Sequence, residues 1–330
     1  MSRRLAAASL VAAMSVVACG GPTEVDEPAR TITLFGPYRD TDADRFTASM
    51  LAPFEAATGI DVRYTGSTDF VFDLQNRLGE GNEPPSIAIV PQPGLVAELT
   101  DADHLVTLGD DVESAISDHY APATRDLGRV DGELVGLPVR ISVKSLVWYR
   151  PDVFDERGWA VPTTSDELTS LVDDIVDEPD IDPWCLAVNA GGATGWPATD
   201  WVEDLVVRRA GTETYLDWAS GAVPFASPSI EAAFTEFSSL VTATGHVAGG
   251  PVAAAQTPVD DVFDGLLAGE PTCAMVKQAD FAQSWLPTGS VVGPGGDVDV
   301  FLLPAETSAS TPPLVVGVDL AVQFDDDPAV

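Results

Sequence analysis

Aromatic rings stand beside hydrogen-bonding groups in two stretches of the chain. The stretch Gly191–Trp201 (GGATGWPATDW) carries Trp196, Asp200 and Trp201. Further on, KQADFAQSW places Phe281 among an amine, amides and a carboxylate. A flat ring covers the C–H face of a sugar, while charged and amide groups hydrogen-bond its hydroxyl rim. These residue types predict a carbohydrate-binding surface, and the alternative for any one tryptophan is a place in the core.

The sequence shows no recognisable catalytic motif. It lacks a nucleophile elbow, a zinc-protease helix and a lysine-bearing phosphate loop. The three histidines, His104, His119 and His246, are scattered, so we expect neither a metal site nor a cofactor. With 52 acidic residues, an acid pair of the glycosidase type cannot be recognised by counting. A secreted glycoside hydrolase therefore stays open as an alternative.

A second set of polar residues follows two predicted strands in the first half of the chain. Asp61–Thr65 alternates like a strand, and Ile87–Val90 is a short apolar run typical of a strand buried on both faces. The loops after them carry Ser67, Asp69 and Gln92. We expect the two strands to be parallel neighbours whose carboxyl ends bind ligand. The alternative is that Asp69, or Ser67, caps the following helix.

Elements alternate along the first part of the chain as they do in α/β folds. A strand at Thr31–Phe35 and a helix at Ala43–Thr58 precede the segment described above, which makes a βαβαβ unit with a parallel sheet. Glu133–Tyr149 is mostly extended and could pass from one lobe into another. The second half is predicted to contain helices at Thr164–Val176, Val202–Ala210, Ile230–Thr244 and Val259–Ala268, and strands at Pro183–Val188, Cys273–Val276, Val298–Leu303 and Leu314–Val322.

Length and charge limit the possible classes. A chain of 330 residues corresponds to about two domains. The formal charge of −36 repels nucleic acid and anionic lipid, so we expect neither as a partner. Such a polyanion is soluble in strong salt because salt screens its self-repulsion. A salty habitat is a hypothesis, and equal stability with and without molar salt would contradict it.

The first residues read as an export signal. Arg3 and Arg4 precede a short apolar run, and Val16-Val17-Ala18-Cys19-Gly20 resembles a lipoprotein signal. We expect residues 1–18 to be removed, Cys19 to be lipidated on the outer face of the cell membrane, and residues 19–30 to be a flexible tether. An ordinary secretory peptide is the alternative, and the twin arginine leaves the export route open.

Two cysteines remain in the mature chain. Cys185 and Cys273 are expected to form a disulfide, since exported proteins mature in oxidising compartments. Two separately buried thiols are the alternative. A Cα separation beyond about 7 Å would rule the disulfide out.

Several stretches resemble one protein family. YTGSTDF, EGNEPPSIAIVPQPG, GLPVRISVKSLVWY, GWPATDWVEDLVVRR, CAMVKQADF and VVGVDLAV are similar to the extracellular solute-binding proteins of ABC sugar importers, the α-glucoside-binding type above all. The resemblance implies a two-lobe fold of the periplasmic-binding-protein type. Its first lobe would be residues 31–141, its second 142–303, and residues 304–330 would return to the first. Family members continue further, and the acidic end at Asp325 reads as the start of a helix, so we expect truncation.

The same resemblance implies what the protein binds and where. It implies a monomer that binds an oligosaccharide between its lobes and delivers it to a permease. A structural surface lipoprotein without a ligand is a further alternative. Phe281 stands where relatives often have tryptophan. The implied ligand contacts are Ser67, Asp69, Gln92, Lys144, Trp196, Asp200, Trp201, Phe281 and Asp319.

Overall fold

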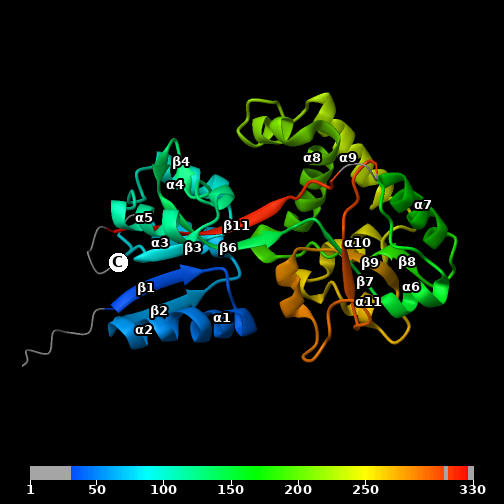
Figure 1. The fold of residues 1–330 in the computed structure, drawn as a ribbon, viewed down its shortest axis with the longest axis horizontal. Coiled ribbons are helices and arrows are strands. Elements are labelled where there is room, and N and C mark those ends of the chain that lie inside the picture. Colours follow the sequence, from blue (N-terminus) through cyan, green and yellow to red (C-terminus); the bar gives the residue numbers. More distant parts are fainter. Residues whose placement is uncertain (1–30, 80, 308–310, 326–330) are drawn as a thin grey trace, which may run out of the picture.

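A computed structural model describes residues 31–79, 81–307 and 311–325 and shows two α/β lobes joined by crossing segments (Figure 1). The expected two-lobe α/β fold is thus confirmed. The expected signal peptide, Cys19, the tether and the last five residues lie outside the described part. Among the helices described, none is long and apolar enough to cross a membrane.

The first lobe is built on a five-stranded sheet. Its strands stand in the order β2 (Asp61–Gly66), β1 (Thr31–Gly36), β3 (Ile87–Val90), β11 (Val316–Gln323) and β6 (Gly136–Val143). β1 pairs in parallel with β2 and with β3, whereas β11 is antiparallel to β3 and β6. The expectation that β2 and β3 are neighbours was wrong, because β1 lies between them.

Helices cover both faces of this sheet (Figure 1). Phe35, Ala88 and Val90 pack in one core cluster with Phe70 and Leu74. The predicted helix 43–58 begins earlier, at Asp40, and its apolar side chains Met50 and Phe54 are 49% and 40% exposed. The elements outside the sheet are α1 (Asp40–Phe46), a π-helical turn (Thr47–Leu51), α2 (Ala52–Thr58), α3 (Phe70–Arg77), α4 (Pro93–Asp101), α5 (Asp110–His119), a 3₁₀ turn (Pro122–Thr124), β4 (Arg129–Val130) and β5 (Glu133–Leu134).

The second lobe is built on a four-stranded sheet. Its strands stand in the order β10 (Asp299–Leu302), β7 (Leu146–Tyr149), β9 (Cys273–Lys277) and β8 (Asp182–Trp184). β7 is antiparallel to β9 and β10, and β8 is parallel to β9. The predicted strand 183–188 is shorter than expected: Cys185 still donates to Met275 of β9, but the Val188 N–H donates to the Ala254 carbonyl of α10 instead of to the sheet.

Long helices surround this second sheet. Thr164 caps α7, since its hydroxyl accepts the Glu167 N–H. The predicted helix 259–268 is a 3₁₀ turn and one short helix instead. The elements are α6 (Pro151–Arg157), α7 (Ser165–Val176), α8 (Trp196–Ala219), α9 (Pro228–Leu240), α10 (Gly250–Gln256), α11 (Asp264–Leu267) and 3₁₀ turns at Gly191–Ala193, Val259–Asp261 and Asp280–Trp285.

Helix α8 begins six residues before the predicted start at Val202. Pro197 lies in its first turn, where the fixed φ of proline suits a helix and its missing N–H costs nothing. Trp196, Asp200 and Trp201 are therefore on a helix rather than in the preceding loop. α8 is interrupted at Gly211, whose φ of 85° is left-handed.

Cys185 and Cys273 form the expected disulfide, with Cα atoms 5.3 Å apart. Cys273 opens β9, and the Cys185 N–H donates to the Met275 carbonyl of the same strand at 2.9 Å. Gly265 lies against the bridge, and a Cβ there would come within 2.6 Å of the Cys185 sulfur. The disulfide is thus held inside the second lobe by a strand and a close backbone approach.

Candidate ligand site between the lobes

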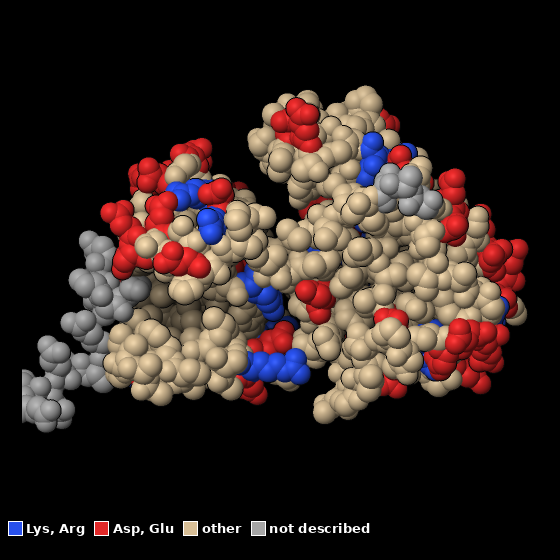
Figure 2. Space-filling view, in the orientation of Figure 1, with Lys and Arg blue, Asp and Glu red and all other residues tan. Residues whose placement is uncertain are grey.

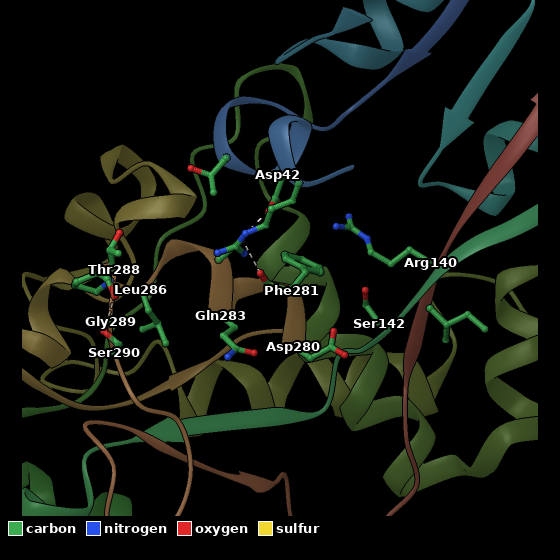
Figure 3. Close-up of a pocket in the computed structure, with 15 residues that line it drawn as sticks. Asp42, Arg140, Ser142, Asp280, Phe281, Gln283, Leu286, Thr288, Gly289 and Ser290 are labelled. Carbon is green, nitrogen blue, oxygen red and sulfur yellow. Dashed lines mark hydrogen bonds between the residues drawn. The ribbon is translucent and has the colours of Figure 1, made fainter. Parts of the chain in front are cut away.

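A cavity of about 530 Å³ lies between the lobes. The start of α1 and the end of β6 form one wall, and the 3₁₀ turn at Asp280–Trp285 with the loop after it forms the other. Figure 3 shows Phe281 in the middle, with Arg140 on one side and Gln283 and Thr288 on the other. The side chains that face it are mostly polar. They include Asp42, Arg45, Arg140, Ser142, Asp280, Gln283, Ser284, Thr288 and Ser290.

Arg140 connects the two walls. Its guanidinium lies 4.4 Å from the ring centre of Tyr38 and 5.4 Å from that of Phe281, which belong to different lobes. Arg140 Nε donates to Asp319 Oδ2 at 2.8 Å, because β6 and β11 pair with these two residues opposite each other. Tyr38 also donates to that oxygen, at 2.6 Å. Burial, and then the Asp319 charge, raise the pKa of Tyr38, which keeps its hydroxyl a donor.

An aromatic platform stands on the second lobe. The rings of Trp196 and Phe281 are 5.8 Å apart and tilted by 55°. Lys144 Nζ lies 5.0 Å from the Trp196 ring centre and donates to both carboxylate oxygens of Asp200, at 2.9 and 3.0 Å. Burial raises the pKa of Asp200, and the charges of Lys144 and Lys277 oppose that shift. The platform therefore combines stacking faces with a fixed ion pair.

Trp201 lies elsewhere. It is 1% exposed and packs edge-on against Trp184 at 4.9 Å in the core of the second lobe. Five residues along an α-helix turn the side chain by about 140°, so Trp201 points away from the face that carries Trp196. Trp201 therefore fills the core, which was the alternative expected for any one tryptophan, and we leave it out of the proposed ligand contacts.

Asp69 reaches across to the second lobe. Its Oδ1 accepts the Gly192 N–H at 2.7 Å. Ser67 is occupied locally, since its hydroxyl accepts the Asp69 N–H at 3.0 Å and donates to Asp73 at 2.5 Å. A Cβ on Gly191 or Gly192 would approach Asp69 Oδ1 to 2.9 or 3.0 Å. Ser67 thus organises the start of α3, and the glycines leave room for an interlobe contact by Asp69.

The predicted residues fall into separate groups. Lys144, Trp196, Asp200 and Phe281 are in contact, and Arg140 connects Phe281 to Asp319. Gln92 precedes α4, and its buried Oε1 has no partner among the residues that the structure describes. Phe281 is the one predicted contact that lines the cavity within the described part of the chain.

Sequence reasoning missed several residues of this region. Tyr38 follows β1 at the same edge of the sheet as the predicted loops, and the rule on strand ends could have found it. Arg140 lies inside a predicted strand, where its contact depends on the register with β11. Ser284 donates to Asp42 at 3.3 Å across the cavity, a contact between residues 242 positions apart.

Charge differs between the outer faces and the junction. In Figure 2 acidic side chains gather on the upper part of the first lobe and along the outer edge of the second, while basic atoms lie at the junction, with some acidic atoms beside them. Arg45 and Arg140, which line the cavity, contribute cations there. Within the described ranges, no group of three or more His, Cys, Asp or Glu residues could hold a metal ion.

The chain matches the family model for bacterial extracellular solute-binding proteins over residues 40–322. It is 38% identical over 318 residues to the α-glucosides-binding periplasmic protein AglE of Rhizobium meliloti, covering 92% of this chain and 67% of that protein. It is 34% identical over 321 residues to the osmoprotective compounds-binding protein GgtB of Synechocystis, covering 97% of this chain and 75% of that protein.

A solved structure agrees on the fold. Maltose-bound MalE3 of T. maritima superposes with a TM-score of 0.67 at 20% identity, covering 91% of this chain and 74% of that one. At such identity the superposition speaks for the fold alone. The family match and the curated relatives show the family: this chain belongs to the bacterial extracellular solute-binding proteins.

Proposed function

We propose that this chain binds an α-glucoside or another oligosaccharide outside the cytoplasm and delivers it to the permease of an ABC transporter. The observation that carries the proposal is the interlobe site, where a cavity lined by both lobes adjoins the Trp196–Phe281 platform. The rings offer faces to a sugar, and the surrounding charged groups offer hydrogen bonds to its hydroxyls. The likeness to AglE, named for α-glucosides, supports this substrate class.

The proposed contacts follow from the geometry. Trp196 and Phe281 would stack on the sugar, and Lys144 and Asp319, both fixed by ion pairs, would orient it. Asp200 stays in the proposed set through its ion pair with Lys144, and Gln92 stays as a first-lobe group that a closed cleft would bring to the ligand. Asp69 would act on closure through its bond to the Gly192 N–H. Ser67 acts mainly on the start of α3.

The finer placement in the cell is part of the same proposal. Cys19 would carry the lipid on the outer face of the membrane, after removal of residues 1–18. The protein would act as a monomer, since one chain supplies both lobes. Detergent partitioning of the parent and a Cys19→Ala variant tests the anchor: the parent should enter the detergent phase and the variant should not.

Calorimetry with the mature chain tests the ligand. Maltose, trehalose and sucrose are titrated, and each mixture is then analysed for hydrolysis products. Saturable binding without turnover supports the proposal. Release of glucose would favour the glycoside hydrolase alternative, and no binding by any sugar would favour a structural lipoprotein.

A second candidate ligand class is the osmoprotective compounds. GgtB, named for them, aligns with 97% of this chain, and the charge of −36 suits a salty habitat. Glycine betaine, which is not a glucoside, should then bind more tightly than maltose at high salt. Preference for maltose under the same conditions supports the α-glucoside proposal.

A further inference from the structure

One face of α8 carries charged residues at every fourth position. Asp200, Asp204 and Arg208 recur at i, i+4 and i+8, so their side chains lie along one side of the helix. The Asp204 and Arg208 side chains are 0% and 4% exposed. Charges buried to this degree need partners, because their desolvation is costly. Most of these partners lie on the two segments that carry the described chain between the lobes.

Asp204 holds the first crossing segment, residues 144–145. Its Oδ1 accepts the hydroxyl of Ser145 at 2.7 Å and also a guanidinium N–H of Arg208, while its Oδ2 faces Lys277 Nζ at 2.8 Å. The Ser145 hydroxyl in turn accepts the Val315 N–H at 2.9 Å. One carboxylate thus joins the chain leaving the first lobe, the chain returning to it, and β9.

Arg208 holds the second crossing segment at two places. It donates to the carbonyls of Leu303 at 2.7 Å and Pro304 at 3.1 Å, where the chain leaves β10. It also donates to the Pro313 carbonyl at 3.1 Å, shortly before β11 begins. Burial lowers the pKa of Arg208, and the adjacent Asp204 opposes that shift. The guanidinium can span these carbonyls because its donors are held in a planar fork.

We infer that Arg208 is a positioning residue for ligand binding. Helix α8, which begins at Trp196, binds both crossing segments through Asp204 and Arg208: one segment directly follows β6 and the other precedes β11. Those strands carry Arg140 and Asp319. These hydrogen bonds fix both crossing segments to the second lobe. In this inference the lobes rotate about Val143 and Val316, the first residues on the first-lobe side of the fixed segments. Arg208 thereby sets the angle between the Trp196–Phe281 platform and the first-lobe residues Arg140 and Asp319. The inference rests on the proposed function for its sugar readout only.

The test compares two adjacent arginines of α8. Arg208→Met keeps the apolar stem and removes the donors, and Arg208→Lys keeps the charge. Arg209→Met is the control, since Arg209 is 46% exposed and pairs with Glu236 on the surface. Sugar-free readouts are hydrogen exchange at the amides of Lys144, Leu303 and Val315 and the radius of gyration from X-ray scattering. The sugar readouts are Kd and the scattering change for the tightest ligand of the parent.

Arg208→Met should raise exchange at those amides and weaken sugar binding at least tenfold, with less compaction on adding sugar. Arg208→Lys should recover part of both, and Arg209→Met should match the parent. A folded Arg208→Met that loses thermal stability but keeps the parent Kd and compaction overturns the inference.

If Arg208→Met does not fold, Ser145→Ala decides, because it removes only the hydroxyl between Asp204 and Val315. Faster exchange at Val315 with reduced compaction supports the inference, and parent behaviour overturns it. If the parent binds no sugar, the proposed function fails. The sugar-free exchange and scattering then still decide on Arg208.

Discussion

The two lobes contribute different chemistry to the same junction. All seven tryptophans and the disulfide belong to the second lobe, where Trp196 and Phe281 form a half-buried platform. The first lobe contributes Arg140 and Asp319, paired on neighbouring strands, and Tyr38, which follows β1 and donates to Asp319. Stacking on the platform needs the second lobe alone, whereas hydrogen bonds from the first-lobe groups need both lobes around the ligand. This difference predicts an order of events, with sugar docking on the second lobe before closure.

The largest expected effect separates the lobes by stability. Replacing Cys185 and Cys273 with serine opens a loop of 88 residues, and the chain-entropy model puts the loss at up to about 4–5 kcal/mol. Because every tryptophan lies in the second lobe, tryptophan fluorescence reports that lobe selectively. Its thermal midpoint should fall by roughly 10 °C or more. An unchanged midpoint in the double variant would show that packing alone holds the second lobe.

The next effect concerns the platform. Trp196→Ala should weaken every sugar that binds, by about 1–3 kcal/mol, because stacking does not depend on a particular hydroxyl. Trp218→Ala is the matched control, since Trp218 lies in the distal part of α8 and packs against the rings of Tyr215 and Phe225. Calorimetry with three disaccharides measures both variants. Equal losses in the two variants, or none in Trp196→Ala, would contradict the assignment.

A smaller effect is expected at the interlobe contact of the first lobe. Asp69→Ala removes the acceptor of the Gly192 N–H, and one hydrogen bond is worth about 1 kcal/mol. Closure should weaken by roughly fivefold for all sugars alike. Asp69→Asn, which keeps an acceptor oxygen, is the control and should stay close to the parent. Loss confined to sugars with one particular hydroxyl would instead show that Asp69 binds the ligand directly.

Local features of the fold could be predicted from sequence, and pairings across long separations could not. The apolar run at Ile87–Val90 and the alternation at Asp61–Thr65 predicted β3 and β2 correctly, because each pattern is contained in a few residues. The position of β1 between those strands depends on pairing energies that no single segment carries. The disulfide was predictable because only two cysteines remained to pair.

The site divides in the same way. Trp196, Asp200 and Phe281 stand out as residue types near glycine-rich or polar stretches, and the structure brings them together with Lys144. Arg140 and Asp319 meet through strand register across 179 positions. Trp201 belongs to the same stretch as Trp196, but because α8 begins at Trp196, the side chain of Trp201 points into the core. Residue types alone do not show where a helix begins, and so do not show which of its side chains face the core.

The smallest expected effect is a dependence of binding on pH through Asp200. Burial raises the pKa of this carboxyl above its ordinary value of 3.8, so the folded state takes up its proton at a higher pH than the unfolded chain does. The stability contributed by protonated Asp200 is therefore fully present below pH 3.8 and is lost as pH rises through the folded pKa. Protonation also removes the charge that holds Lys144 beside Trp196.

Sugar binding should therefore weaken modestly as pH falls toward that folded pKa, while the fold itself gains from relief of the buried charge. Asp200→Asn should remove this part of the pH dependence of Kd and bind at neutral pH as the parent does in acid. The matched control is Asp217→Asn, a change on the exposed distal part of α8. Calorimetric Kd values from pH 7 downward compare the three proteins, and a parent-like slope in Asp200→Asn would assign the pH dependence to another group.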